Sequence, residues 1–162
     1  MRKKILFLAG MMACGSLAGA QEISKTWVAD KGNGTYQNPV LHADYSDPDV
    51  CATGDDFYMT ASSFNCIPGI PILHSNDLVN WSLVNYALPV QEPETFFDKA
   101  QHGKGVWAPA IRFHNGEFYI YWGDPDYGIY MIKTKDPKGK WSKPVLVKAG
   151  KGMIDATPLW DE

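Results

Sequence analysis

Two carboxylates in this sequence stand where an acidic side chain could do chemistry. Asp47 is followed by Pro48 and then by an apolar, strand-forming run, so its carboxylate is expected at the mouth of a strand. Asp155 stands in a related setting, in the run Met-Ile-Asp-Ala-Thr-Pro at 153–158. Two positioned carboxylates are the minimum equipment for hydrolysing a glycosidic bond. A plainer interpretation stays open for each, because an Asp at a turn before a strand needs no chemical role.

Short β-type runs must position these carboxylates. Hairpin turns are indicated by Gly54-Asp55 and Asn115-Gly116, and no segment shows a long helical period. The pattern predicts an all-β fold with strands at residues 50–53, 57–62, 70–75, 110–113, 118–122 and 129–133.

An internal repeat organises these strands. Pro48 recurs as Pro109, 61 residues later, and the Phe-Tyr pair at 57–58 recurs at 118–119 with the same spacing. Each unit then predicts a third strand, an Asp, a Trp and a fourth strand, which is the sequence pattern of β-propeller blades. The alternative is chance similarity among hairpins. A third unit begins at 157–160, and because propellers close with at least about four blades, the chain is expected to be a truncated part of a longer protein.

The first 20 residues are predicted to be a signal peptide. Three basic residues at 2–4 precede a short apolar core at 5–13, and small residues at 18–20 offer a cleavage point before Gln21. This predicts export to the periplasm or beyond the cell, with a linker at 21–37. A lipoprotein cleavage box at Cys14 is the alternative, although the residues before it match poorly.

Charge and cysteine content exclude some classes of function. Cleavage after residue 20 would remove three positive charges and no negative one, so the net charge would move from −3 to −6. An acidic chain argues against a nucleic-acid partner, and no later segment is long and apolar enough to predict a membrane span. Cys51 and Cys66 could form a disulfide or pack as small buried residues. No Cys/His cluster has the spacing of a metal site.

From Asn38 to the end, the sequence resembles glycoside hydrolase family 43, the five-bladed propeller β-xylosidases and α-L-arabinofuranosidases. The resemblance implies a partial catalytic propeller domain at 38–162. The segments that carry it, in order, are 38–40 with 46–48, 54–58, 74–81 and 105–109.

The resemblance also implies roles for four residues. Asp47 matches the general base, which in an inverting enzyme takes a proton from the attacking water. Asp155 matches a carboxylate that orients the general acid and raises its pKa by like charge, although position 156 is Ala where the family has Pro. Phe64 and Trp107 match aromatic residues that line the sugar pocket, since flat aromatic faces suit the C–H faces of sugars. Both could instead be ordinary core aromatics.

The family's general acid is a Glu in a Glu-Gly-Pro motif, and no Glu of this chain has that context. The segment alone is therefore expected to be inactive. The implied substrate is an oligosaccharide or polysaccharide containing xylose or arabinose, with no cofactor required and a possible structural calcium ion in the complete propeller channel. The acidic turn at 123–127 is expected to be a solvated loop, with a polar contact at the pocket rim as the alternative. Two other functions stay open, a non-catalytic carbohydrate-binding propeller and a propeller glycosidase of another family, for example one acting on fructans.

Overall fold

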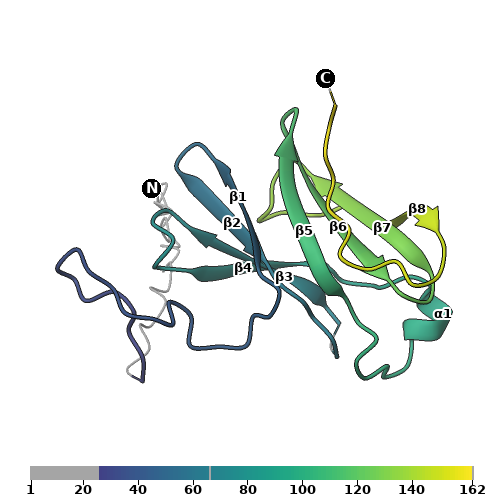
Figure 1. Ribbon diagram of the computed structural model, residues 1–162, viewed down its shortest axis with the longest axis horizontal. Helices are drawn as coiled ribbons and strands as arrows, with labels where there is room; N and C mark the ends of the chain where they lie inside the picture. Colours follow the sequence, from purple (N-terminus) through teal and green to yellow (C-terminus); the bar gives the residue numbers. More distant parts are fainter. Residues whose placement is uncertain (1–25, 66, 162) are drawn as a thin grey trace, which may run out of the picture.

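The computed structural model describes residues 26–65 and 67–161. The signal peptide expected at 1–20, the alternative cleavage site at Cys14, and Cys66 lie outside the described residues. The described part of the expected linker forms a loop outside the sheets, closed by an isolated bridge between Asp30 and Tyr36 (Figure 1).

The first sheet is a four-stranded antiparallel meander in the order β1-β2-β3-β4. Its strands are β1 (Asp49–Thr53), β2 (Asp56–Thr60), β3 (Gly69–Ser75) and β4 (Ser82–Leu88). The turn between β1 and β2 uses Gly54 at φ 59°, a left-handed conformation that glycine adopts without steric cost. Three of these strands match the sequence prediction to within two residues at either end. The fourth, β4, was predicted by the repeat without a residue range.

The second sheet repeats this plan in the order β5-β6-β7-β8. Its strands are β5 (Trp107–His114), β6 (Glu117–Asp124), β7 (Gly128–Thr134) and β8 (Val145–Ala149). Asn115 and Gly116 join β5 to β6 with positive φ angles of 48° and 78°, as a two-residue hairpin loop of type I′ requires. The connection between the sheets carries α1 (Glu94–Phe97), a short helix that the sequence did not predict.

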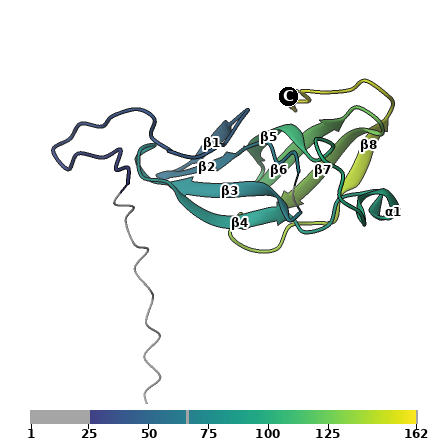
Figure 2. The same ribbon diagram turned by 90° about the horizontal axis from the view of Figure 1, so that it is seen from below.

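The two sheets lie side by side with β1 next to β5, as neighbouring propeller blades do (Figures 1 and 2). Aromatic and branched aliphatic side chains fill the space between and within the blades. Tyr58 of β2 meets Phe118 of β6 edge to face, with ring centroids 5.2 Å apart. Among the described residues, the core cluster consists of Tyr58, Ile70, Ile72, Ala87, Leu88, Val106, Ile111, Phe118, Ile120, Trp122, Tyr130, Ile132 and Trp141.

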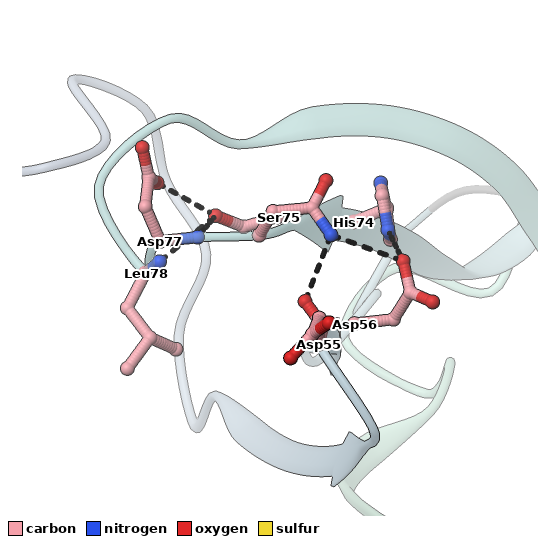
Figure 3. Close-up of polar contacts among 7 residues, drawn as sticks. Asp55, Asp56, His74, Ser75, Asp77 and Leu78 are labelled. Atoms are coloured by element: carbon pink, nitrogen blue, oxygen red, sulfur yellow. Dashed lines mark hydrogen bonds and ion pairs between the residues drawn. The ribbon is translucent and has the colours of Figure 1, made fainter.

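Polar side chains form hydrogen bonds with one another at the end of the first blade where β2 begins and β3 ends (Figure 3). His74 Nε2 and Asp56 Oδ1 are 2.5 Å apart, and Asn76 Nδ2 donates to the Asp55 carbonyl at 2.8 Å. Beyond β3, the Asp77 carboxylate accepts bonds from the Val79 and Asn80 N–H groups and from two side chains. Because Asp47 precedes β1 and β1 pairs antiparallel to β2, this cluster lies at the opposite end of the blade from Asp47. It therefore serves the fold rather than the candidate site.

Candidate active site

Asp47 stands at the entrance to β1 with its carboxylate fixed and open to solvent. Its φ angle of 50° places it in the left-handed region. The ring of Pro48 fixes the φ angle of the residue between Asp47 and β1, which restricts the backbone there. Ser62 Oγ donates a 2.6 Å hydrogen bond to Asp47 Oδ2, and the Ser62 N–H donates to the Ser46 carbonyl at 3.0 Å. Within the described residues no donor reaches Oδ1, so this oxygen is available to an approaching water molecule.

Ser62 also connects Asp47 to the second blade. The same Oγ accepts a 2.9 Å hydrogen bond from the Ala108 N–H, next to Trp107. Sequence reasoning missed Ser62. A signal was present in the Ser-Ser-Phe run at 62–64, which directly follows β2 and returns the chain to the end of the blade where Asp47 lies.

Phe64 and Trp107, the two aromatics that the resemblance assigns to the sugar pocket, are brought together. Their ring centroids are 6.4 Å apart in an edge-to-face arrangement, and both side chains are half-buried. An isolated bridge between Ser63 and Val106 holds their backbones in register. Gly105 permits this approach, because a Cβ there would lie 2.1 Å from the Ser63 carbonyl oxygen.

The two aromatic rings nevertheless open into separate hollows. Phe64 lines a hollow of about 190 Å³ together with Gln91 and Phe97. Trp107 lines another of about 210 Å³, which Phe97 also borders. Neither hollow has Asp47 or Asp155 in its lining, so the described residues form two hollows of mixed aromatic and polar lining rather than a single pocket around the carboxylates.

Asp155 lies exposed at the same end of the second blade as Trp107. It follows Met153 and Ile154, which cross β6 where that strand ends. The crossing depends on Gly123, because a Cβ there would lie 2.5 Å from the Met153 carbonyl oxygen and 2.6 Å from the Ile154 Cα. Gly123 thus positions the Asp155 backbone, a role that sequence reasoning missed because the two residues are distant in the chain.

Backbone conformation is similar at three positions, one before β1, one at the start of β5 and one in the segment after β8. Asp47, Ala108 and Asp155 all have positive φ angles, of 50°, 37° and 55°. Aligning these residues puts Ala156 at the position of Pro48 and Pro109. Pro158, which the repeat had matched to those prolines, lies two residues later. Asp155 therefore occupies the position equivalent to Asp47, although its following residue is not proline.

One guanidinium joins the segments that follow the two carboxylates. Arg112 Nη1 lies 2.5 Å from Asp49 Oδ2, and its Nη2 donates to Thr157 Oγ1 at 2.9 Å. Asp49 is two residues after Asp47, and Thr157 is two residues after Asp155. No hydrogen bond or ion pair joins Asp47 directly to Asp155 in the part of the chain that the structure describes, and Arg112 links the segments that follow them.

The acidic turn after β6 is not wholly solvated, in contrast to the sequence prediction. Asp126 is exposed and pairs with Lys104 at 2.7 Å, but Asp124 is only 4% exposed. Burial raises the pKa of Asp124 above its ordinary value, while the N–H groups of Asp126 and Tyr127, both bonded to Oδ1, act in the opposite direction. Local sequence did not reveal this, because the burial of Asp124 arises only in the folded chain.

The described residues contain neither a candidate metal-binding group nor a candidate membrane-spanning helix. Among the described residues there is no group of three or more His, Cys, Asp or Glu side chains that could hold a metal ion, and the calcium expectation stays a prediction. No helix in the described ranges is long and apolar enough to cross a membrane.

The sequence matches the model of glycosyl hydrolases family 43 over residues 36–162. A β-xylosidase of Formosa agariphila is 35% identical across 98% of this chain and 29% of its own length. A non-reducing end α-L-arabinofuranosidase of Bacteroides ovatus, BoGH43B, is 38% identical across 70% of this chain and 22% of its own length.

Solved structures show the same likeness. The GH43 protein BlXynB of Bacillus licheniformis superimposes with a TM-score of 0.63 and 33% identity, covering 74% of this chain and 25% of that one. The chain thus spans about a quarter of the length of the relatives it matches. The fold class predicted from the sequence, part of a five-bladed β-propeller, is confirmed by these structural matches.

Proposed function

The chain belongs to glycosyl hydrolase family 43, and from this premise we propose that the protein hydrolyses xylosidic or arabinofuranosidic bonds in plant oligosaccharides or polysaccharides with inversion at the anomeric carbon. Relatives named as β-xylosidase and as α-L-arabinofuranosidase support the two substrate classes equally. The two named activities differ in the sugar that they release, so the proposal includes both.

In the proposed reaction Asp47 is the general base. Its Oδ1 takes a proton from water as the water oxygen attacks the anomeric carbon, and the hydrogen bond from Ser62 to Oδ2 holds the carboxylate in one rotamer. The leaving oxygen is protonated by a Glu that has no match among residues 1–162. Inverting enzymes hold their two carboxyl groups roughly 6.5–9.5 Å apart to admit the water. Asp155 is proposed to orient that Glu and to raise its pKa by like charge.

The observation that carries this proposal is the state of the Asp47 carboxylate. One oxygen is fixed by Ser62, the other is unbonded within the described residues, and the side chain is solvent-exposed at a strand entrance that is bonded to the segment carrying Trp107. A carboxylate that only caps a turn would direct its oxygens to local backbone N–H groups. The bond to a serine 15 residues away is instead suited to holding a base in place.

The test uses the intact protein that contains this segment and the Asp47→Asn variant. We expect kcat on aryl β-xyloside and aryl α-L-arabinofuranoside to fall by about 10²–10⁴-fold, the usual contribution of a general base. Asp44→Asn is the matched control, since Asp44 is also exposed and lies three residues away. The anomer released should be inverted when followed by proton NMR. Full activity of Asp47→Asn would refute the assignment of the base.

Two further parts of the proposal have their own readouts. Residues 1–162 alone are proposed to be inactive, and turnover by the isolated segment would contradict this. The proposed export depends on residues 1–20, so cell fractionation should find the protein in the periplasm or medium, and fatty acylation at Cys14 would favour a lipoprotein instead. Glycan binding without any hydrolysis by the intact protein would favour the binding-module interpretation.

A further inference from the structure

The turn between β6 and β7, residues 125–127, follows a buried carboxylate that the proposed reaction does not use. Asp124 is only 4% exposed, and its Oδ1 accepts the N–H groups of Asp126 and Tyr127 at 2.8 and 3.1 Å. An Asp that bonds the backbone two residues later fixes the turn that follows it. Because burying a carboxylate is costly, its place at a hairpin loop calls for a role beyond closing that loop.

This β6–β7 turn holds the segment that leads to Asp155. The Gly150 N–H donates to the Tyr127 carbonyl at 3.0 Å, and the Gly152 N–H donates to the Pro125 carbonyl at 2.8 Å. Both donors lie within five residues of Asp155. Since both acceptors belong to the turn, the conformation of the turn determines where the segment lies.

The backbone on either side of the β6–β7 turn packs directly against the same segment. A Cβ on Gly128, at the start of β7, would lie 2.1 Å from the Lys148 carbonyl oxygen and 2.9 Å from the Gly150 nitrogen. At the end of β6, Gly123 lies against residues 153–154 in the same way. The chain therefore reaches Asp155 through a run of backbone that contacts β7, the turn and β6 in succession.

We propose that Asp124 is a positioning residue for the glycosidase reaction: by fixing the β6–β7 turn it holds segment 150–154, and through that segment it holds Asp155 in place. The inference rests on the proposed function, in which Asp155 orients the general acid and raises its pKa by like charge. Asp124 exchanges no proton with the substrate, and its effect on the reaction passes through Asp155.

Three substitutions in the intact protein separate this role from a simple effect of charge. Asp124→Ala removes the acceptor of both turn N–H groups. Asp124→Asn removes the charge only, because an amide oxygen can accept the same two bonds. Asp126→Ala is the matched control, since it removes a negative charge from the same turn. The Asp126 side chain is exposed and pairs with Lys104, and its backbone N–H to Asp124 is kept.

Amide hydrogen exchange of peptides covering residues 148–157, followed by mass spectrometry, measures the positioning itself. In Asp124→Ala we expect exchange there to be about tenfold faster, the effect of losing one backbone hydrogen bond of ordinary net strength. Asp124→Asn and Asp126→Ala should exchange at nearly the wild-type rate. This readout needs no turnover, so it decides whether Asp124 holds the segment even if the protein cleaves no pentoside.

Kinetics on aryl pentosides measure the consequence for the reaction. The kcat of Asp124→Ala should fall at least about tenfold, since misplacing a group by about 1 Å can cost about 10²-fold, while KM changes little. The alkaline limb of the pH profile of kcat/KM reports the general acid. It should move to lower pH as the like charge of Asp155 moves away, and the acidic limb, which reports Asp47, should stay in place. Asp124→Asn should largely restore both kcat and the profile.

Several results would overturn the proposal. Wild-type exchange at residues 148–157 in Asp124→Ala would show that Asp124 does not hold the segment, and faster exchange with wild-type kinetics would limit its role to the fold. Equal kinetic losses in Asp124→Asn or Asp126→Ala would make charge responsible instead.

Pro125→Gly replaces Asp124→Ala if that variant does not fold. It frees the φ angle within the turn and keeps the carbonyl that accepts the Gly152 N–H. Exchange at residues 148–157 should become faster and the alkaline limb should move to lower pH, each by less than expected for Asp124→Ala. Wild-type behaviour of Pro125→Gly in both measurements would then refute the positioning role.

Discussion

Ser62 Oγ lies 2.6 Å from Asp47 Oδ2 and at the same time accepts the Ala108 N–H at 2.9 Å. One hydroxyl therefore fixes the carboxylate at the entrance of the first blade relative to the entrance of the second. Both bonds run between segments that are far apart in the chain, so the geometry at Asp47 depends on how the two blades pack.

Ser62→Ala should lower kcat on aryl pentosides by about 10-fold to 100-fold, because hydrogen bonds to charged groups contribute about 1.5–3 kcal/mol and the carboxylate would lose its fixed rotamer. The KM should change little, since Ser62 is not proposed to contact substrate. Ser142→Ala serves as control, because Ser142 Oγ accepts the exposed Lys133 N–H of β7 and does not contact Asp47. Equal kcat for wild type and Ser62→Ala would exclude the positioning role.

Gly123→Ala should displace Asp155. The added Cβ would overlap the Met153 carbonyl and the Ile154 Cα, so the segment before Asp155 must move. We expect kcat to fall at least tenfold and the free energy of unfolding to drop by about 1–3 kcal/mol, as for other overpacked sites.

Gly54→Ala is the matched control for Gly123→Ala. Gly54 has a φ of 59° and nothing within 4 Å of an added Cβ, so this substitution strains the backbone without displacing a neighbour. It should lower stability while leaving kcat intact. If both variants lose kcat equally, strain rather than displacement of Asp155 is responsible.

Arg112→Lys should loosen the connection between the segments that follow the two carboxylates. A single ammonium group cannot reproduce the forked contacts to Asp49 and Thr157. Urea denaturation should show a loss of about 1–2 kcal/mol, the lower part of the range for charged hydrogen bonds, because the Arg112 side chain is 37% exposed. The kcat should decrease with it. Lys133→Met breaks the exposed pair with Glu117. It should leave the free energy of unfolding and kcat nearly unchanged.

Stability should fall on acidification through Asp77. Hydrogen bonds from the Asn80 backbone and side chain, followed by those from Val79 and Ser75, hold the pKa of Asp77 well below its ordinary value. Because the folded-state pKa is depressed, the stabilisation is complete above the unfolded pKa of about 3.9 and is lost as the pH falls towards the folded value. The difference in urea midpoint between about pH 7 and about pH 3 should shrink in Asp77→Asn. In Asp44→Asn the urea midpoint should change between the two pH values as much as in wild type. An equally large change in Asp77→Asn would contradict the role of Asp77 in acid sensitivity.

Much of the fold could be predicted from local sequence. Gly54-Asp55 and Asn115-Gly116 marked the two hairpins correctly because turn conformations with positive φ favour few residue types. The recurrence of Pro48 at Pro109 predicted two equivalent blades, which the two four-stranded sheets bear out. The short helix α1 was not predicted, since four residues are too few to show a helical period.

The candidate site was predicted only where a residue has a recognisable local context. Asp47, Asp155, Phe64 and Trp107 all stand in short runs that could be read directly, and their roles remain predictions to be tested. Gly123 and Arg112 could not be selected, because their importance lies in contacts with residues 30 or more positions away. Ser62 was missed although the run at 62–64 offered a signal, because its bonds to Asp47 and Ala108 form only in the folded chain.

The sequence alone determined the strands, the turns and the blade repeat, because each depends on residues within one hairpin. Only the tertiary structure decided that Asp47 is held by Ser62, that Gly123 lets the Asp155 segment cross β6, and that Gln91 is buried with an amide that bonds to none of the described residues. Burial and hydrogen-bond pairing depend on which distant segments come together when the blades pack, and no local pattern of residue types records that.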